Sequence, residues 1–243
     1  PIARIEMLNK DQMGISIQYS KLKNVEEVPT LFFEFHGSEI SKYENGLQSA
    51  MVVRWPGKVK AGSTTSAMVE YVDVLPTFLE AAGENIPEVL EGKSFLPVLL
   101  GKQSSHKKYV YGLMTTRGIN NGSETYCIRS VIGERYKYIW NFTPQIEFKN
   151  ACTQTATFKS WLKKAEGGDL DAKDKVRRYK WRPEVEVYDL QNDPYEWNNL
   201  AGNEGIKPVQ NRLSRVLKEW MGSQGDKGQE TELAALERQR RGK

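Results

Sequence analysis

The stretch that decides the fold runs from Ser41 to Gly83 and reads SKYENGLQSAMVVRWPGKVKAGSTTSAMVEYVDVLPTFLEAAG. Within it, the run Met51-Val52-Val53-Arg54-Trp55 predicts a mostly buried strand, because four of its five residues are apolar and several are bulky or β-branched. The turn Trp55-Pro56-Gly57-Lys58 follows, since proline fixes one backbone angle and glycine accepts a left-handed one.

A helix is predicted from Val72 to Ala82, with Pro76 in its first turn and Gly83 as its stop. Asp73 stands at its start, where a carboxylate can accept hydrogen bonds from free backbone amides. A catalytic carboxylate is the competing interpretation of Asp73. Capping is favoured, because it is the common task of an aspartate in this position.

Downstream, alternation of apolar and polar residues predicts further elements. Leu96 to Leu100 is a short apolar element, and a hairpin is expected at Ile132-Gly133-Glu134. Four strands are expected, at Tyr109–Leu113, Tyr126–Val131, Arg135–Trp140 and Val185–Leu190. An amphipathic helix from Pro208 to Met221 should cover the small antiparallel sheet that they form, and Trp220 should pack in that core. From Gly222 the chain turns polar, and we expect it to lie on the surface or to be disordered.

The first residues have a different pattern. Ile2 to Glu6 alternates like a strand, and Thr30 to Phe35 is predicted as a second, stronger strand, whereas Asn9 to Lys23 is predicted to be helical. Strand, helix and strand make a plausible α+β piece, but one without partner strands of its own.

Composition bounds the classes of protein to which the chain can belong. With 243 residues it is long enough for one large domain or two small ones. Net charge is +4, but 35 basic and 31 acidic residues are mixed, which argues against nucleic acid as the partner. No apolar run reaches the roughly 20 residues that span a bilayer. Cys127 and Cys152 form neither a disulfide framework nor a metal-ligand spacing, and two unpaired thiols are expected.

Several runs resemble the sulfatases of the alkaline-phosphatase-like fold, and among them the heparan N-sulfatases, or N-sulfoglucosamine sulfohydrolases. The general sulfatase runs are YENG, RWPGKVKAG, YVDVLPTFLEAAG and GKSFLPVLLGK. The runs that resemble the subgroup or its C-terminal region are TTRGINNGSETYCIRSV, RYKYIWNF, ATFKSWLKKAEGGD and VEVYDLQNDPYEWNNLA. The resemblance covers residues 41 to about 228. It implies an α/β (α+β) fold, the C-terminal part of a sulfatase, with a four-stranded antiparallel sheet packed on a C-terminal helix.

Residues 1–39 resemble instead a segment of flavin-linked D-lactate dehydrogenases, through ARIE-x-L, YSKL and PTLFFEFHGS. No flavin is expected, because the flavin-binding part of that family is missing. The domain organisation predicted from both resemblances is a dehydrogenase-like segment, the end of a sulfatase core, a sulfatase C-terminal domain and a polar tail, over residues 1–39, 40–104, 105–222 and 223–243.

The sulfatase resemblance implies a chemistry that these residues do not supply. That family oxidises a cysteine in a Cys-x-Pro-Ser-Arg context to formylglycine and holds calcium with clustered carboxylates and amides. The motif is missing here, and Phe35-His36-Gly37 stands near the place of a metal segment. Phenylalanine cannot ligate calcium, so His36 is interpreted as a strand-end residue. Lys42 does not match the family's sulfate-binding spacing, and His106 is expected to be solvent-exposed in a polar loop. We therefore expect no catalytic residue, no metal ligand and no cofactor in this chain.

What remains is substrate contact. Thr116 and Arg117 follow a strand, where a loop faces a pocket in related enzymes, and Arg117 can grip a sulfate or carboxylate with two hydrogen bonds. Tyr126 and Arg129 lie near the start of the next strand. These four residues are the candidate substrate-binding set. The alternative is that Arg117 and Arg129 make ordinary surface ion pairs. Asp189 and Asp193 are interpreted as turn residues rather than a metal or acid pair.

The expected function is that of a truncated sulfatase, a sulfuric ester or sulfamate hydrolase that is inactive alone. One alternative is a non-catalytic module that binds sulfated glycans, and another is a flavin-linked dehydrogenase fragment. The expected partner is a sulfated glycosaminoglycan or sugar, with no nucleic acid and no membrane. The apolar face of Met51–Trp55 is expected to lack cover and to promote oligomerisation. The chain starts at Pro1 without a signal peptide, as expected of a fragment, and its location stays open, because such enzymes are periplasmic, secreted or lysosomal.

Overall fold

The computed structural model describes residues 2–9, 12–18, 30–34, 47, 50–115, 122–123 and 125–238, and the structural statements below concern these residues. The chain divides into two compact units. The first comprises residues 1–39 and 48–110, and the second comprises residues 40–47 and 111–243. Each unit is described by itself.

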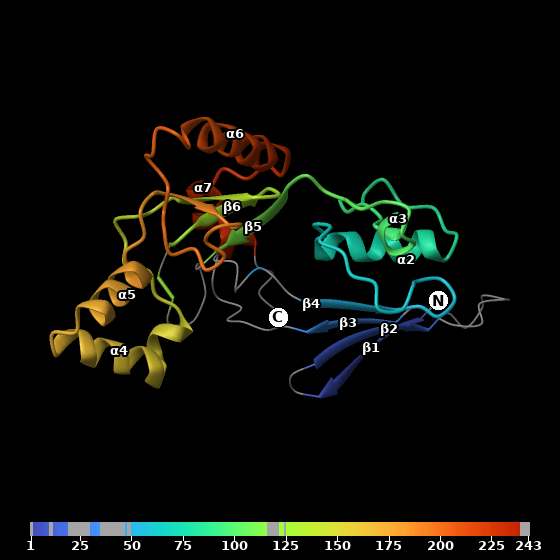
Figure 1. Ribbon diagram of the computed structural model, residues 1–243, viewed down its shortest axis with the longest axis horizontal. Helices are drawn as coiled ribbons and strands as arrows, with labels where there is room; N and C mark the ends of the chain where they lie inside the picture. The colour runs from blue at the N-terminus through green and yellow to red at the C-terminus, as the bar shows by residue number, and fades with distance from the viewer. Residues whose placement is uncertain are drawn as a thin grey trace. The chain divides into compact units, whose positions relative to one another are not determined.

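The first unit contains an antiparallel sheet whose strands follow chain order. Its strands are β1 (Ile2–Asn9), β2 (Gln12–Gln18), β3 (Thr30–Glu34) and β4 (Ala50–Arg54), as Figure 1 shows. The helix predicted from Asn9 to Lys23 is wrong over residues 12–18, which are β2. Met13, Ile15 and Ile17 recur at every second position, and this period favours a strand over a helix.

One face of β4 is covered by short helices. These are the 3₁₀ turn η1 (Tyr71–Asp73), α2 (Val74–Ala81) and α3 (Leu96–Leu99), which confirm the predicted helix and the apolar element. Met51 and Val53 pack against the buried cluster of Phe78, Phe95 and Val98. Val52, between them, is 56% exposed, so the strand is half-buried rather than mostly buried. The expectation that its apolar face lacks cover is wrong. β4 still ends the order of its sheet, and oligomerisation through that edge stays a prediction.

The end of α2 confirms its predicted stop. Gly83 has a φ of 75°, and its amide donates to the Glu80 carbonyl while the Glu84 amide donates to the Leu79 carbonyl. These two bonds form a Schellman motif, which needs a left-handed residue and therefore favours glycine. The predicted turn after β4 is also present, closed by the Lys58 amide on the Trp55 carbonyl at 3.1 Å, with Gly57 at a φ of 71°.

The second unit is built on a four-stranded sheet in chain order, which confirms the four predicted strands. They are β5 (Val110–Met114), β6 (Ile128–Ile132), β7 (Tyr136–Asn141) and β8 (Val185–Asp189). β6 and β7 form the predicted hairpin, with Ile132 opposite Lys137 and the Gly133 amide bonded to the Tyr136 carbonyl. β8 pairs antiparallel with β7.

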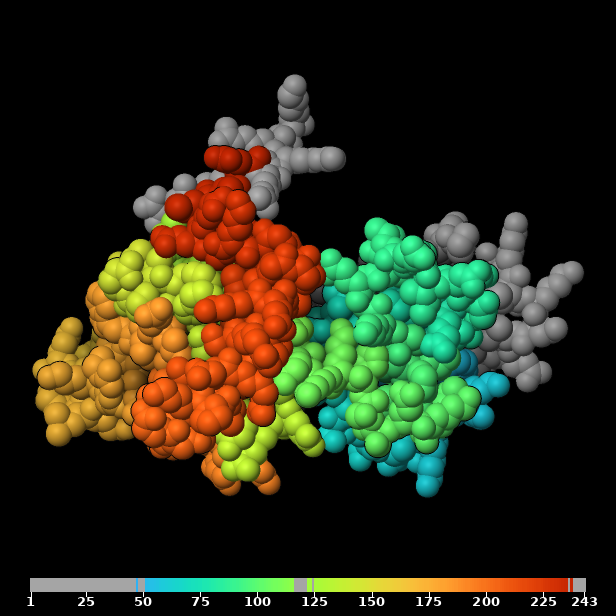
Figure 2. Space-filling model, turned by 90° about the horizontal axis from the view of Figure 1, so that it is seen from above, coloured from blue at the N-terminus to red at the C-terminus, as the bar shows by residue number. Residues whose placement is uncertain are grey.

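Helix α6 (Lys207–Ser223) covers this sheet by contact with β6 and β7, as predicted (Figure 1). Its Leu213, Leu217 and Met221 are buried, and Trp220 stacks on Tyr111 with ring centroids 4.5 Å apart. Helix-on-sheet packing therefore accounts for Trp220 without a sugar ligand. In the space-filling view of Figure 2, α6 and the following residues, in orange-red, lie on the face turned to the viewer.

Two features of this unit escaped the sequence analysis. The first is a helical hairpin of α4 (Ala156–Glu166) and α5 (Leu170–Lys180), preceded by the 3₁₀ turn η2 (Ala151–Gln154). The second is the segment after α6, where α7 (Gln229–Leu233) and α8 (Ala235–Arg238) form. Most of the described residues from Gly222 onward are exposed, as expected of a surface segment, but the segment is helical rather than disordered. Asp226 pairs with buried Arg129, and Glu232 is 1% exposed, so two of its side chains tie it to the core.

Limited proteolysis should leave a fragment close to residues 105–222, extended to about 238 by the packed C-terminal segment. Burial is described for residue 47 and for residues 51–115, 122–123, 125–235 and 237. Among these, the buried apolar residues other than Pro76, Phe78, Phe95, Leu96 and Val98 all lie in the second unit. Local stability rises with buried apolar contact, so protease should cut the first unit sooner. Mass spectrometry of a trypsin time course checks this, and survival of residues 1–90 with loss of 105–222 would contradict it.

Candidate functional site

The predicted substrate-binding set falls partly outside the described residues. Thr116 and Arg117 lie there, and so do His36 and Lys42. The other two members, Tyr126 and Arg129, are described. Tyr126 lies two residues before β6, and Arg129 lies within it.

Tyr126 is a core residue. It is 0% exposed, and its ring meets Phe148 edge-on at a centroid distance of 5.0 Å. Burial raises the pKa of the Tyr126 phenol to about 12. The charge of Arg182 acts to lower this pKa, and that of Glu186 acts to raise it. A neutral phenol in such a place anchors the core by packing. In this structure the side chain offers no surface to a substrate.

Arg129 is buried as well, at 3% exposure. Its guanidinium donates to both carboxylate oxygens of Asp226, and to the carbonyls of Met114 at 3.1 Å and Ile128 at 2.9 Å. Burial opposes its charge, but the bonds to Asp226 hold the pKa of Arg129 above its usual value. Burial acts to raise the pKa of Asp226, but the pairing with Arg129 and the hydrogen bonds from Gly228 and Thr231 together outweigh it and keep that pKa below its usual value. The geometry gives Arg129 a structural partner, in line with the ion-pair alternative, although in the core rather than on the surface.

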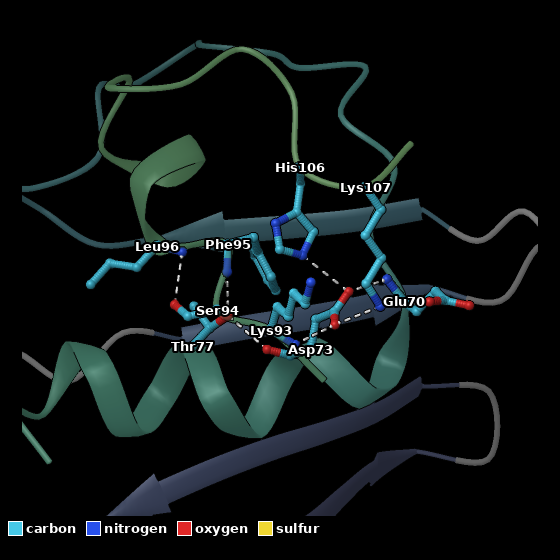
Figure 3. A network of polar contacts seen from close by, with 9 residues as sticks. All are labelled: Glu70, Asp73, Thr77, Lys93, Ser94, Phe95, Leu96, His106 and Lys107. Atoms are coloured by element: carbon cyan, nitrogen blue, oxygen red, sulfur yellow. Dashed lines mark hydrogen bonds and ion pairs between the residues drawn. The ribbon is translucent and has the colours of Figure 1, made fainter. Parts of the chain in front are cut away.

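Asp73 organises a second polar cluster, shown in Figure 3. Its carboxylate is 0% exposed and lies 2.8 Å from Lys107 Nζ and 3.3 Å from His106 Nε2. It accepts hydrogen bonds from the backbone amides of Glu70, at 2.9 Å, and Lys93, at 2.8 Å. Burial acts to raise the pKa of the Asp73 carboxyl, but these partners outweigh it and hold the pKa below its usual value.

This arrangement corrects two predictions. Asp73 stands at the N-cap position of α2 but makes no side-chain bond to that helix. Its carboxylate instead completes a capping box with Glu70 at the start of η1 and bonds across to the Lys93 loop. His106 is not solvent-exposed: its side chain is 7% exposed, with its ring edge-on to Phe95. The loop around it looked polar in sequence, but Lys107 and Asp73 draw it onto the core. The cluster ties η1, the Lys93 loop and residues 106–107 together, which is a structural task.

The run VEVYDLQNDPYEWNNLA contains strand β8 and the loop that follows it. Asp193 accepts from the backbone amides of Trp197, at 3.0 Å, and Asn198, at 2.7 Å, which confirms its role as a turn residue. Glu196 forms a buried ion pair with Lys137 of β7 at 2.8 Å. Asn199 accepts from the Val187 amide at 2.8 Å, along the free edge of β8. The residues specific to this run therefore hold the sheet together.

Asp189 is the last residue of β8, and its ion pair predicts that stability depends on pH. Hydrogen bonds from Arg135, at 2.9 and 2.6 Å, hold the pKa of the Asp189 carboxyl at about 2. A lowered pKa stabilises the fold above the ordinary value of 3.8, and this contribution is lost as pH falls from about 4 through 2. The urea midpoint of the wild type should therefore exceed that of Asp189→Asn at pH 6, and the gap should narrow at pH 2. An equal gap at both pH values would contradict the assignment.

The described residues do not suit the calcium ion that the sulfatase resemblance implies. No group of three or more His, Cys, Asp or Glu side chains with metal-binding proximity occurs among the described residues. Calcium takes six to eight oxygen ligands, and neither Asp73, engaged with cations and amides, nor Asp226, engaged with Arg129, is available to it. Cys127, which is buried, and Cys152 are not joined in a disulfide, as expected. None of the described helices is both long and apolar enough to cross a bilayer.

Comparisons with known proteins identify the origin of this fold. Residues 39–152 match the family described as N-sulphoglucosamine sulphohydrolase, C-terminal. An ulvan-active sulfatase of Formosa agariphila is 39% identical over 181 residues, 74% of this chain and 34% of the relative. An N-acetylglucosamine-6-O-sulfatase of Bacteroides thetaiotaomicron is 28% identical over 73% of this chain and 25% of the relative. The chain thus spans about a third or less of the length of these relatives.

Solved structures agree on the fold. A 2-O GAG sulfatase superposes with a TM-score of 0.54 at 21% identity, over 78% of this chain and 33% of that one. A protein in complex with D-glucosamine-2-N,6-O-disulfate gives 0.52 at 24% identity, over 74% of this chain and 29% of that one.

The dehydrogenase resemblance of residues 1–39 has no support in these comparisons. A second ulvan-active sulfatase of Formosa agariphila is 28% identical over 228 residues, 89% of this chain and 37% of the relative. That alignment leaves fewer residues outside it than the segment 1–39 contains, so it includes part of that segment. The chain thus carries a sulfatase C-terminal domain of the alkaline-phosphatase-like fold, with sulfatases as its homologues.

Proposed function

We propose that this chain forms the C-terminal part of a hydrolase that removes sulfate from sulfated sugars. The observation that carries the proposal is 39% identity to an ulvan-active sulfatase over 74% of the chain, together with the family match over residues 39–152. A domain of this kind supplies a wall of the substrate pocket, while the reacting groups come from elsewhere in the enzyme.

The bond to be cleaved is the finer part of the proposal. The matching family bears the name of a sulfamate hydrolase, whereas the curated relatives named above act on ulvan or on a 6-O-sulfate. Heparan N-sulfatase-like activity and sulfuric ester hydrolysis are therefore both within the proposal. Glucosamine substrates sulfated only at N2 or only at O6 separate them, because one bond should be cleaved at least tenfold faster.

We also propose that the 243 residues alone do not turn over, since they contain no Cys-x-Pro-Ser-Arg motif to yield formylglycine. Formylglycine would supply the nucleophile and calcium would neutralise the sulfate oxygens, both on residues outside this chain. The test is to mix the chain with a sulfatase N-terminal part that carries the motif. Sulfate release by the mixture, and by neither part alone, is the expected result; inactivity of every such mixture, with both parts folded, counts against the proposal.

The predicted substrate contacts belong to this proposal. Arg117 is proposed to bind a sulfate or carboxylate of the sugar, with Thr116 beside it. Tyr126 and Arg129 are buried in the described structure, so they would act by holding the start of β6 in place. In an active mixture, Arg117→Ala should raise KM at least tenfold with little change in stability. A KM unchanged by Arg117→Ala would remove it from the site.

A non-catalytic module that binds sulfated glycans is the second candidate. The concentration of cations on the α4–α5 hairpin favours glycan binding, and such binding is compatible with catalysis by the whole enzyme. The flavin-linked dehydrogenase alternative has nothing in its favour beyond residues 1–39. A flavin absorbance spectrum in the purified protein would revive it.

A further inference from the structure

The hairpin of α4 and α5 carries the positive charge of this protein. Residues 156–182 contain nine Lys and Arg and four Asp and Glu, a net charge of +5, whereas the entire chain has +4. The other 216 residues together are therefore slightly negative. Figures 1 and 2 show α4 and α5 at the margin of their unit, yellow to light orange, with an open outer surface.

The hairpin is a rigid, well-defined platform. Thr155 caps α4 by accepting from the Phe158 amide, and Asp169 caps α5 by accepting from the Ala172 amide. Phe158 and Ala172 are buried and fix each helix to the core. Between the helices, Gly168 takes a φ of 93°, a value that favours glycine. Charges on such a scaffold stay at fixed separations, which suits the binding of a repeating polymer.

Four of its cations form no ion pair with a carboxylate of the described residues. On α5, Lys175 pairs with Asp171, Arg177 and Arg178 pair with Asp174, and Lys180 pairs with Glu147. No ion pair joins the other four exposed lysines to a carboxylate within the described ranges; they are Lys159, Lys163, Lys164 and Lys173. Helix dipoles explain Lys163 and Lys164, which stand in the last turn of α4. They do not explain Lys159 and Lys173, which follow the first turn of their helices, where a dipole opposes a cation.

Exposed apolar groups accompany these cations. Trp161 is 37% exposed, Trp181 is 48% exposed and Leu170 is 79% exposed. Exposed indole rings and cations on one helical hairpin fit a ligand that presents both apolar ring faces and anionic groups. Sugar rings with sulfate esters have this character, whereas a simple inorganic anion has no use for the tryptophans.

We propose that the α4–α5 hairpin is a docking surface for a sulfated polysaccharide, made of other residues than the predicted substrate contacts Thr116 and Arg117. Lys159, Lys163, Lys164 and Lys173 pair with the sulfates, and Trp161 and Trp181 pack on sugar faces. The surface holds the chain near a polymeric substrate and leaves the bond to be cleaved to the rest of the enzyme. The choice of a sulfated polymer over other polyanions rests on the proposed function.

The first arm of the test measures binding of the 243-residue chain to heparin, to desulfated heparin of equal length and to single-stranded DNA, from 50 to 300 mM NaCl. The hairpin variant is Lys159→Gln/Lys163→Gln/Lys164→Gln. The matched control, Lys207→Gln/Arg212→Gln/Arg215→Gln, removes three exposed cations from α6 in the same unit. The hairpin variant should weaken heparin binding about tenfold. The slope of the logarithm of its binding constant against the logarithm of the salt concentration should become shallower by about two to three. The control should change the heparin affinity less than twofold.

The second arm uses only the wild type, so that it does not depend on the folding of a variant. Bound heparin should protect Lys159, Lys163, Lys164 and Lys173 from acetylation more than Lys207 and Lys218, as read by mass spectrometry. Each of three results would overturn the proposal. They are protection of Lys207 and Lys218 equal to that of the four hairpin lysines, an equal loss of heparin affinity in the two variants, and equal affinity for heparin and for desulfated heparin or DNA. If the hairpin binds heparin but the complemented mixture releases no sulfate, this inference stands and the proposed function fails. If the mixture releases sulfate but the hairpin does not bind heparin, the inference fails and the proposed function stands.

Discussion

Replacing Arg129 by methionine is expected to lower the free energy of unfolding of the second unit by about 3–5 kcal/mol. The change removes four hydrogen bonds and leaves the Asp226 carboxylate, whose side chain is 10% exposed, without its cation. An uncompensated buried charge costs more than the ion pair itself contributes, which is why the loss should be large. If Arg129 were instead a solvent-facing substrate contact, its replacement would barely affect stability.

Hydrogen exchange read by mass spectrometry localises the effect. Amides of β6 and of residues 222–238 should lose protection in Arg129→Met, whereas those of residues 51–110 should not. Arg212→Met, an exposed cation of α6, is the control and should stay within about 0.5 kcal/mol of the wild type. The double variant Arg129→Met/Asp226→Leu removes both charges and should recover part of the loss. A double variant less stable than the sum of the two single changes would contradict the ion-pair account.

Asp73→Ala is expected to destabilise the first unit by a similar amount, about 3–5 kcal/mol. The carboxylate bridges Lys107, His106 and the amides of Glu70 and Lys93 (Figure 3). Its loss leaves two backbone donors without their acceptor and leaves Lys107 with Glu70 as its carboxylate partner. Residues 51–110 should exchange faster, and residues 125–238 should keep their protection. Glu88→Ala, an exposed carboxylate of the same unit, is the matched control and should have little effect.

The pH dependence of this effect follows from the lowered pKa of Asp73. The contribution of the ionised carboxylate is complete above the ordinary value of 3.8 and is lost as pH falls through the lower value of the folded state. The difference in urea midpoint between the wild type and Asp73→Ala should therefore be constant from pH 5 to 7 and shrink in strong acid. A difference that grows on acidification would contradict the assignment.

Elements with local punctuation could be predicted from the sequence. The Schellman stop at Gly83, the turn at Gly57 and the hairpin at Gly133 all use a glycine or a short turn whose physics is contained in a few residues. The helix α6 was predictable because its apolar residues recur with helical spacing. The same logic would have found α4 and α5, since Thr155, Gly168 and Asp169 are their cap, stop and cap. Their low apolar content hid them.

Residues whose roles depend on distant partners could not be predicted. Arg129 is separated from Asp226 by 97 positions, and Asp73 meets residues 93 and 107 only through the fold. The helix wrongly predicted over Asn9–Lys23 shows the opposite error, because β2 gains its stability from pairing with β1 and β3. The buried ion pairs of the candidate site therefore could not be found from local sequence patterns.

The most direct test of this account is sulfate release by the purified chain alone. An aryl sulfate and N-sulfoglucosamine, each with added calcium, are the substrates, and ion chromatography of free sulfate is the readout. We expect release indistinguishable from that of buffer, because these residues contain no cysteine that can become formylglycine and their carboxylates serve the fold. Turnover near 1 s⁻¹, an ordinary enzymatic rate, would contradict the account.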